Sequence, residues 1–209
     1  MCMGKNAMNL LSYGLFILTA KQGEKENGCI VNTVQQVTSS PNRICVAVNK
    51  ANYTHDMIME TKEFAVSVIS EKADFELFKR FGFRSGRDVD KFEDFEDFQT
   101  ADNGIRYVTK GTNSYLLAKV VMTQDLGSHT LLIAEVTKAE VFSDDASVTY
   151  DYYHKNIKPK PQQVGKTEDG QTIWRCVICG YEYVGEEIPE DFICPICKHP
   201  ASDFEKVTK

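Results

Sequence analysis

Four of the seven cysteines form two C-x2-C pairs near the C-terminus, and this spacing constrains the fold more than any other feature. The pairs, Cys176 with Cys179 and Cys194 with Cys197, are separated by 14 residues. Together they can supply four thiolates to one tetrahedral ion, and either Zn(II) or a single iron fits four sulfurs. A domain this small has little core of its own, so the metal would supply most of its stability. The sequence therefore predicts a metal-binding domain over residues 174–209.

The residues around the cysteines favour one metal over the other. Gly180 permits the positive φ that the turn after the first pair requires. Five aromatic side chains are expected to form a dry shell around the sulfurs: Trp174, Tyr181, Tyr183, Phe192 and Phe204. The strings W-x-C-x-x-C-G-Y-x-Y and P-E-D-F-x-C-P-x-C resemble rubredoxin, in the compact form that is fused to other redox modules. That resemblance implies one iron ion carrying one electron, whereas spacing alone leaves a zinc ribbon open.

The composition is that of a globular protein. The chain has 209 residues, of which 42% are hydrophobic and 26% charged, and its net charge is −6. These values exclude a disordered chain, and no apolar run approaches the ~20 residues of a membrane span. A chain this acidic does not favour general electrostatic binding to nucleic acid. Small molecules or proteins are the expected partners.

The apolar stretch at residues 10–20 is interpreted as a first β-strand and not as the core of a signal peptide. Ser12 and Gly14 interrupt it, and no small-x-small cleavage site follows before Lys21. Without export, the protein is expected to be cytoplasmic, where thiols stay reduced. The three scattered cysteines are then expected to act as small buried hydrophobic residues: Cys2, Cys29 and Cys45.

The pattern of residues 1–154 predicts a mainly β domain. Six segments are rich in Val, Ile, Thr and aromatic residues, namely 13–20, 29–37, 43–49, 64–70, 114–124 and 129–142. Short helical patterns lie at 54–61 and 73–81. A further helical stretch is expected where phenylalanine recurs every three residues, at Phe92, Phe95 and Phe98. Many strands and few helices predict a closed barrel with helical insertions.

A linker is predicted over residues 155–173. The segment lacks hydrophobic periodicity and contains Pro159, Pro161, Gly165 and Gly170. It separates the predicted barrel, residues 1–154, from the metal-binding domain.

Four strings follow one another in the barrel: GCIVNTVQQVTSSP, VNKANYTH, FGFRSGRDVDKF and GSHTLLIAEV. In this order they resemble the flavin reductase family of FMN-binding split barrels, and the likeness covers nearly all of residues 8–154. The resemblance implies a homodimer with one FMN per subunit near the interface, reduced by NADH or NADPH. The expected fold is mainly β, a split β-barrel with short helical insertions plus a small rubredoxin-like domain.

Polar residues at the ends of predicted strands supply the chemistry that a flavin needs. An isoalloxazine ring requires fixed donors and acceptors at its polar edge, for which the candidates are Asn32, Thr33, Gln36, Thr38, Ser39 and Ser40. A phosphate requires cations and helix-start N–H groups, for which the candidates are Asn49, Lys50, Asn52, Thr54, Arg84, Ser85, Arg87 and Lys91. Without the resemblance, the first set is explained equally well as a polar turn at a β-edge. The cations from Arg84 to Lys91 are explained equally well as a solvated loop with surface ion pairs. The resemblance places His129 near the flavin as the candidate catalytic residue, with His55 and His154 as weaker candidates.

Two functional hypotheses follow. In the first, NAD(P)H gives two electrons to FMN, and the iron takes them one at a time, which explains why the two domains are joined. This fusion is similar to the NADH:flavodiiron-protein reductases of anaerobes, whose flavodiiron partner reduces nitric oxide or oxygen. In the second, the C-terminal domain is a structural zinc ribbon for docking, and the barrel binds or releases reduced flavin.

Overall fold

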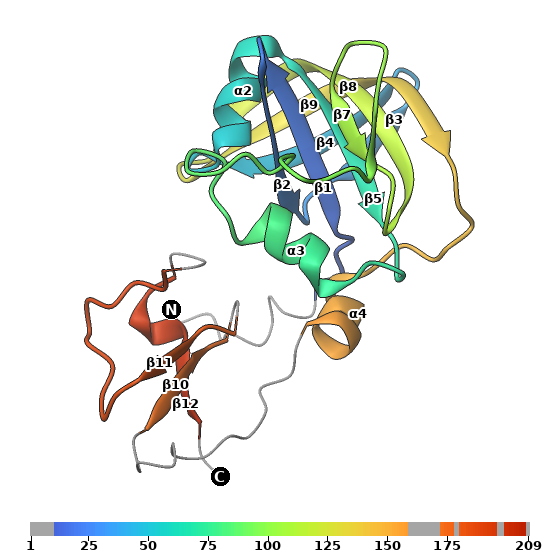
Figure 1. Cartoon of the computed structure of the whole chain (residues 1–209). Helices are drawn as coiled ribbons and strands as arrows, with labels where there is room; N and C mark the ends of the chain where they lie inside the picture. The colour runs from blue at the N-terminus through green and yellow to red at the C-terminus, as the bar shows by residue number, and fades with distance from the viewer. Residues whose placement is uncertain (1–10, 159–171, 178–179, 196–198, 208–209) are drawn as a thin grey trace.

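The computed structural model describes residues 11–158, 172–177, 180–195 and 199–207. It consists of a β-barrel built from the first of these segments and a small three-stranded sheet built from the others (Figure 1). Among the residues described, no helix is long and apolar enough to cross a membrane.

Seven antiparallel strands form the barrel sheet, in the order β2-β1-β5-β8-β9-β4-β3. Their bounds are β1 (Phe16–Gln22), β2 (Lys25–Val31), β3 (Gln35–Ser39), β4 (Asn42–Asn49), β5 (Glu63–Ile69), β8 (Thr112–Asp125) and β9 (His129–Val141). The segment after β2 is joined to β4 by a side chain, because the Thr33 hydroxyl donates to the Ala47 carbonyl oxygen and accepts from the Ala47 N–H, at 2.9 and 3.0 Å. The mainly β split-barrel prediction is confirmed.

The predicted strand at residues 29–37 is wrong in one respect, because the structure divides it in two. Strand β2 ends at Val31 and β3 begins at Gln35. The two strands lie at opposite ends of the sheet order, so the chain must leave one edge and cross to the other. The residues of this crossing, Asn32 and Thr33, are therefore placed at the split of the barrel.

Both faces of strand β5, which lies between β1 and β8, are buried. Phe64 and Val66 pack in the barrel interior with Leu18, whereas Ile69 packs outside it with Ile17. This explains why β5 is an almost continuous apolar run and not a strict alternation of apolar and polar residues.

Two helices cover the barrel. Helix α2 (Tyr53–Thr61) buries Met57 and Ile58 against the interior cluster. Helix α3 (Phe75–Gly82) begins where the Asp74 carboxylate accepts from the Leu77 N–H at 3.0 Å, and buries Leu77, Phe78 and Phe81. This spacing of three and four residues gives one apolar face. Both predicted helices are confirmed.

The predicted helical stretch at Phe92, Phe95 and Phe98 is wrong. Turns occupy residues 91–94, and Phe98 begins β6 (Phe98–Thr100), which pairs with β7 (Arg106–Val108). The three rings nevertheless share one cluster, with Phe92 and Phe95 both edge-on to Phe81. Ring packing against α3, and not helical periodicity, accounts for the spacing.

The barrel segment ends in α4 (Tyr150–Tyr152) and a π-helical turn η1 (Tyr153–Ile157). The small sheet contains β10 (Ile173–Cys176), β11 (Glu182–Val184) and β12 (Phe204–Val207), with a 3-10 turn η2 (Ala201–Asp203) before β12. Residues 155–157, at the start of the predicted linker, thus belong to η1, and Ile173 at its end begins β10. The predicted domain bounds themselves stay a prediction.

Candidate functional site

A cavity of about 630 Å³ opens where β2 and β4 end and where the loop after α3 passes them. Eight of the residues predicted for flavin binding or catalysis line it: Asn32, Thr33, Asn49, Asn52, Arg84, Ser85, Lys91 and His129. These residues come from four segments far apart in the chain. The cavity is therefore a product of the barrel, and its polar lining suits a polar, charged ligand.

The beginning of α2 faces this cavity. Asn52 precedes the helix and makes no side-chain capping bond, and the Asn49 side chain accepts from the Ala51 N–H at 2.9 Å. The first N–H groups of a helix carry partial positive charge and lack partners within the helix. With Arg84 and Lys91 on the same cavity, they create a setting that favours an anionic group.

Lys91 is a buried cation in the cavity wall. Only 4% of the residue is exposed, and its Nζ donates to the carbonyl oxygens of Gly28 and Phe81 at 2.7 and 3.1 Å. Burial lowers the pKa of Lys91 to about 8, and the neighbouring Cys29 opposes that shift. Burial raises the pKa of the Cys29 thiol. Lys91 thus places in the cavity wall a positive charge whose pKa is about 8.

His129 begins β9 at the rim of the cavity. Its Nδ1 lies 2.9 Å from the Ser128 hydroxyl, and its Cα is paired with that of Asn49 across the β4–β9 ladder. His55, by contrast, is buried with Nε2 at 2.9 Å from the Thr130 hydroxyl and Nδ1 at 3.1 Å from Asp56. His129 is therefore the histidine of this pair that a ligand can reach.

Seven predicted residues do not line the cavity. Gln36, Thr38 and Ser39 lie on the exposed strand β3, and Ser40 lies in the turn after it. Thr54 is buried and accepts from Asn27 at 3.0 Å. Lys50 pairs with Asp125 at 2.7 Å, and Arg87 pairs with Asp56. Their roles in cofactor binding stay predictions.

Eleven residues of the lining were missed by sequence reasoning, among them Asn27, Cys29, Tyr53, Gly86 and His199. Asn27 is 2% exposed, and its Oδ1 has no hydrogen-bond partner, although its Nδ2 donates to Thr54. A Cβ added at Gly86 would lie 2.1 Å from that oxygen. No local pattern signals Asn27, Cys29 or Gly86, because only the closed barrel brings β2 against the loop after α3.

The small domain brings two of the predicted metal ligands into a common core. Cys176 and Cys194 are 1% and 0% exposed, and they share one cluster with Phe204. Cys179 and Cys197 lie outside the described residues. The Gly180 N–H donates to the Cys176 carbonyl oxygen at 2.9 Å, and Gly180 has a φ of +81°, as predicted. The buried thiols and this turn fit a four-sulfur metal site.

The predicted aromatic shell surrounds the two described cysteines. Trp174, Tyr181, Tyr183 and Phe192 all pack against the cluster of Cys176, Cys194 and Phe204. The rings of Tyr183 and Phe192 lie 4.8 Å apart, and the Trp174 indole donates to the Gly185 carbonyl oxygen at 3.2 Å. Such a shell excludes water from a metal centre, which tunes its reduction potential.

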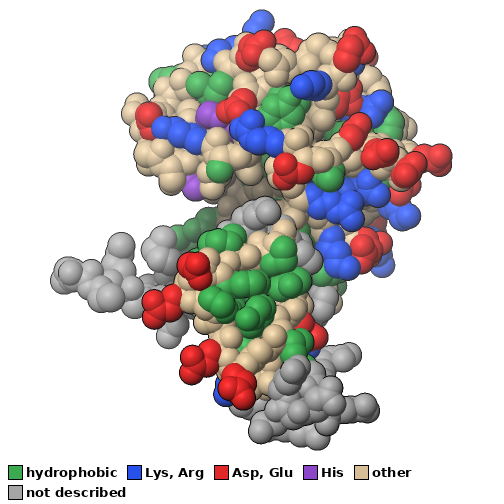
Figure 2. All heavy atoms as spheres, turned by 60° about the vertical axis from the view of Figure 1, so that its left-hand side comes forward, with side chains coloured by type: hydrophobic (Ala, Val, Ile, Leu, Met, Phe, Trp, Pro, Cys, Tyr) green, Lys and Arg blue, Asp and Glu red, His purple; other side chains and the backbone are tan. Residues whose placement is uncertain are grey.

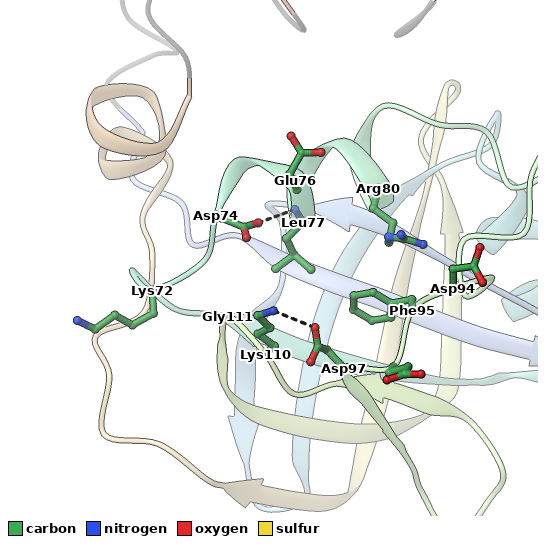
Figure 3. A pocket seen from close by; sticks show the side chains of 11 residues that line it. Lys72, Asp74, Glu76, Leu77, Arg80, Asp94, Phe95, Asp97, Lys110 and Gly111 are labelled. Carbon is green, nitrogen blue, oxygen red and sulfur yellow. Dashed lines mark hydrogen bonds and ion pairs between the residues drawn. The ribbon is translucent and has the colours of Figure 1, made fainter.

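A second hollow, of about 490 Å³, lies beside α3 (Figure 3). Several of its charged side chains are bonded to one another or to the backbone. Asp74 caps α3, Lys110 pairs with Asp97 at 3.3 Å, and Arg80 donates to the carbonyl oxygens of Lys91 and Glu93. These bonds give Asp74, Lys110 and Arg80 a structural role in holding the region around α3 together.

The barrel and the small domain each match a known family. The flavin reductase-like domain matches residues 8–160, which is most of the chain. This chain belongs to the flavin reductase-like family. Residues 174–205 match the rubredoxin-like domain of rubrerythrin. The protein is therefore a flavin reductase with a rubredoxin-like domain, and the two families imply a flavin and iron as its cofactors.

Two relatives match over nearly their whole length, and a solved structure shares the fold of the barrel. A high molecular weight rubredoxin of Moorella thermoacetica is 35% identical over 98% of this chain and 100% of the relative. A ferric-chelate reductase (NAD(P)H) of Archaeoglobus fulgidus is 39% identical over 82% of this chain and 98% of its own. The NADH:FAD oxidoreductase of Streptomyces globisporus has the same fold, with a TM-score of 0.60 at 22% identity over 66% of this chain and 81% of its own.

Proposed function

We propose that this flavin reductase passes electrons from NAD(P)H through FMN to the iron of its rubredoxin-like domain, and on to a protein acceptor. The supporting observation is that one chain combines a polar, cationic cavity in a flavin reductase barrel with a buried cysteine site. When bound, FMN exchanges two electrons with a nicotinamide and single electrons with an iron ion. The high molecular weight rubredoxin matches 98% of this chain and 100% of its own length, so the match spans both domains.

The cavity residues have three proposed roles. Arg84 and Ser85, with the start of α2, hold the phosphate of FMN. Asn32 and Asn49 supply donors and acceptors to the polar edge of the flavin ring, and Thr33 keeps the barrel closed there through its bonds to Ala47. His129, at the rim, orients the nicotinamide donor.

Binding of FMN tests this proposal directly. We expect the purified protein to contain or take up one FMN per chain, and NADH or NADPH to bleach its visible absorption under anaerobic conditions. Iron analysis of the same sample is expected to give one iron per chain. A protein that takes up no flavin would overturn the assignment of the cavity.

Titration of Lys91 is expected to make FMN binding depend on pH. The ammonium is charged below the pKa of about 8 and neutral above it, so the attraction for the FMN phosphate is lost as the pH rises. We expect the FMN dissociation constant to increase between pH 7 and pH 9. Lys91→Met should weaken binding at pH 7 and flatten this profile, as measured by flavin fluorescence on samples whose folding has been checked by circular dichroism. An unchanged profile in Lys91→Met would contradict the role of this ammonium.

A homodimer is part of the proposal. Val37, Val121 and Met122 are 46%, 46% and 58% exposed. Val121 and Met122 lie on β8, and Val37 lies on β3 at its bulge, so β9 and β4 separate the two positions in the sheet. Exposed apolar side chains on the barrel sheet suit an interface with a second copy. Light scattering of the holoprotein is expected to give twice the mass of the chain.

The acceptor is proposed to be a flavodiiron protein that reduces nitric oxide or oxygen. Figure 2 shows hydrophobic side chains gathered on the small domain with acidic side chains around them. Two exposed hydrophobic residues of this domain are Val184 and Ile193. The exposed acids between the two cysteine pairs are Glu182, Glu186, Glu187, Glu190 and Asp191. An apolar centre with a charged rim is the anatomy of a transient protein interface.

Salt is expected to slow electron transfer to that acceptor. Exposed charges are screened within about 10 Å at 0.1 M salt, so steering by the acidic rim weakens as salt rises. A variant with Glu186, Glu187 and Glu190 changed to glutamine should be slower and less sensitive to salt, with its visible spectrum unchanged. The measurement is the second-order rate of oxidation of the reduced domain by a flavodiiron protein. A flat salt profile would leave these acids as surface charges.

A further inference from the structure

The small domain contacts the barrel at the rim of the flavin cavity through both of its cysteine-bearing loops. The Lys158 ammonium, at the end of η1, donates to the carbonyl oxygen of Val177. His199 lies among the residues that line the cavity, together with His129 of the barrel. One contact therefore comes from each loop of the small domain.

Both contacts are linked directly to buried cysteines. Val177 follows Cys176 in the chain, so its carbonyl oxygen belongs to the first cysteine loop. The Cys194 N–H donates to the His199 carbonyl oxygen at 2.8 Å, so His199 is held by the backbone of the second loop. Val177 thus lies at Lys158 and His199 lies at the cavity, each beside a loop that carries a described cysteine.

The barrel side of the Lys158 contact adjoins the same cavity. Lys158 closes η1, with its own N–H donating to the Tyr153 carbonyl oxygen at 2.8 Å. It lines a smaller apolar hollow of about 220 Å³ with Tyr153 and His154. This hollow shares three lining residues with the flavin cavity: Ile30, Gly82 and Phe83. The two contacts therefore lie on neighbouring parts of one rim.

Charge favours this arrangement. An iron ion held by four thiolates carries net negative charge, and the Lys158 ammonium lies beside the first cysteine loop. Hydrogen bonds from an ammonium to a backbone carbonyl are stronger than neutral ones. Lys158 thus offers the cysteine loops both a directional bond and a charge of the right sign.

We propose that Lys158 and His199 are positioning residues that dock the two cysteine loops over the mouth of the flavin cavity of the same chain. The inference rests on the proposed function, because it assigns this docking to electron transfer from the flavin to the iron. Each transfer takes one electron from the reduced flavin and converts ferric to ferrous iron. A fully reduced flavin supplies two such electrons in turn and releases its proton to water, while the protein acceptor reoxidises the iron between them.

The single tryptophan gives a readout of docking that does not depend on turnover. Trp174 is the only tryptophan of the chain and packs against the cysteine cluster of the small domain. In full-length protein loaded with FMN and with zinc in place of iron, energy transfer from Trp174 to the flavin reports the distance between the domains. We compare the parent with Lys158→Gln, His199→Gln and the double variant. Lys155→Gln is the matched control, because Lys155 lies on the same turn but pairs with Asp151 at 2.8 Å.

We expect energy transfer to fall in Lys158→Gln, to fall further in the double variant and to stay unchanged in Lys155→Gln. Loss of one ammonium hydrogen bond shifts a docking equilibrium by about tenfold, so the flavin-to-iron rate of iron-loaded Lys158→Gln should fall by about that factor. Its FMN content, iron spectrum and rate of flavin reduction by NADH should match the parent. Parent-like energy transfer and parent-like flavin-to-iron rates in the double variant would overturn the docking. A parent protein without bound flavin or iron would instead overturn the proposed function.

Discussion

Cys194→Ser is expected to abolish the visible chromophore of the iron centre while leaving NADH-dependent reduction of the flavin largely intact. Cys194 is fully buried, and a serine hydroxyl is a poor substitute for a thiolate in a four-sulfur site. Metal binding contributes on the order of 10 kcal/mol to the folding of such small domains, so the rubredoxin-like domain should also unfold. The visible spectrum, the iron content and the tryptophan fluorescence of Trp174 together measure this loss.

Cys45→Ser provides the matched control for that substitution. Cys45 is half-buried on β4, where its Cα is paired with Ile133 of the barrel sheet. It lies outside the small domain, so the iron spectrum should survive its replacement. An intact chromophore in Cys194→Ser would contradict the ligand assignment. A colourless parent that contains one zinc per chain would support the alternative, a structural zinc ribbon used for docking.

Gly86→Ala is expected to weaken FMN binding strongly. A Cβ at this position would lie 2.1 Å from Asn27 Oδ1. Moving the Asn27 side chain away would cost free energy, because it is buried and donates a hydrogen bond to Thr54. The loop must shift instead, and it carries Arg84 and Ser85. Loss of one hydrogen bond to a charged group costs about 1.5–3 kcal/mol, which raises the FMN dissociation constant about ten- to a hundredfold.

A double variant shows whether the clash with Asn27 causes the effect. Asn27→Ala together with Gly86→Ala removes the obstructing amide, so FMN binding should recover relative to Gly86→Ala alone. The interaction energy follows from the cycle of parent, two single variants and double variant. Fluorescence titration with FMN measures all four proteins, and thermal unfolding checks that each one folds. Additive effects on the dissociation constant would contradict a direct clash as the cause.

Much of the architecture could be predicted from the sequence, because local patterns carry it. The two C-x2-C pairs with their aromatic neighbours predicted a rubredoxin-like domain, and the described cysteines are buried in that shell. Alternating β-branched runs predicted the long strands, and the helical pattern at residues 73–81 predicted α3. In each case the pattern lies within one short segment of the chain. The physical preference of that segment is therefore sufficient to predict the element.

Which residues line the cavity was determined by the tertiary structure. The resemblance predicted polar residues near Asn32 and cations near Arg84, but it gave no reason to add Asn27, Cys29 or His199 to the lining. Closure of the barrel places β2 against the loop after α3, and this closure also buries Lys91 and lowers its pKa. The same topology leaves Thr38 on the exposed strand β3, away from the cavity. Distances between residues far apart in the chain are fixed only when the sheet closes, so no short pattern in the sequence carries them.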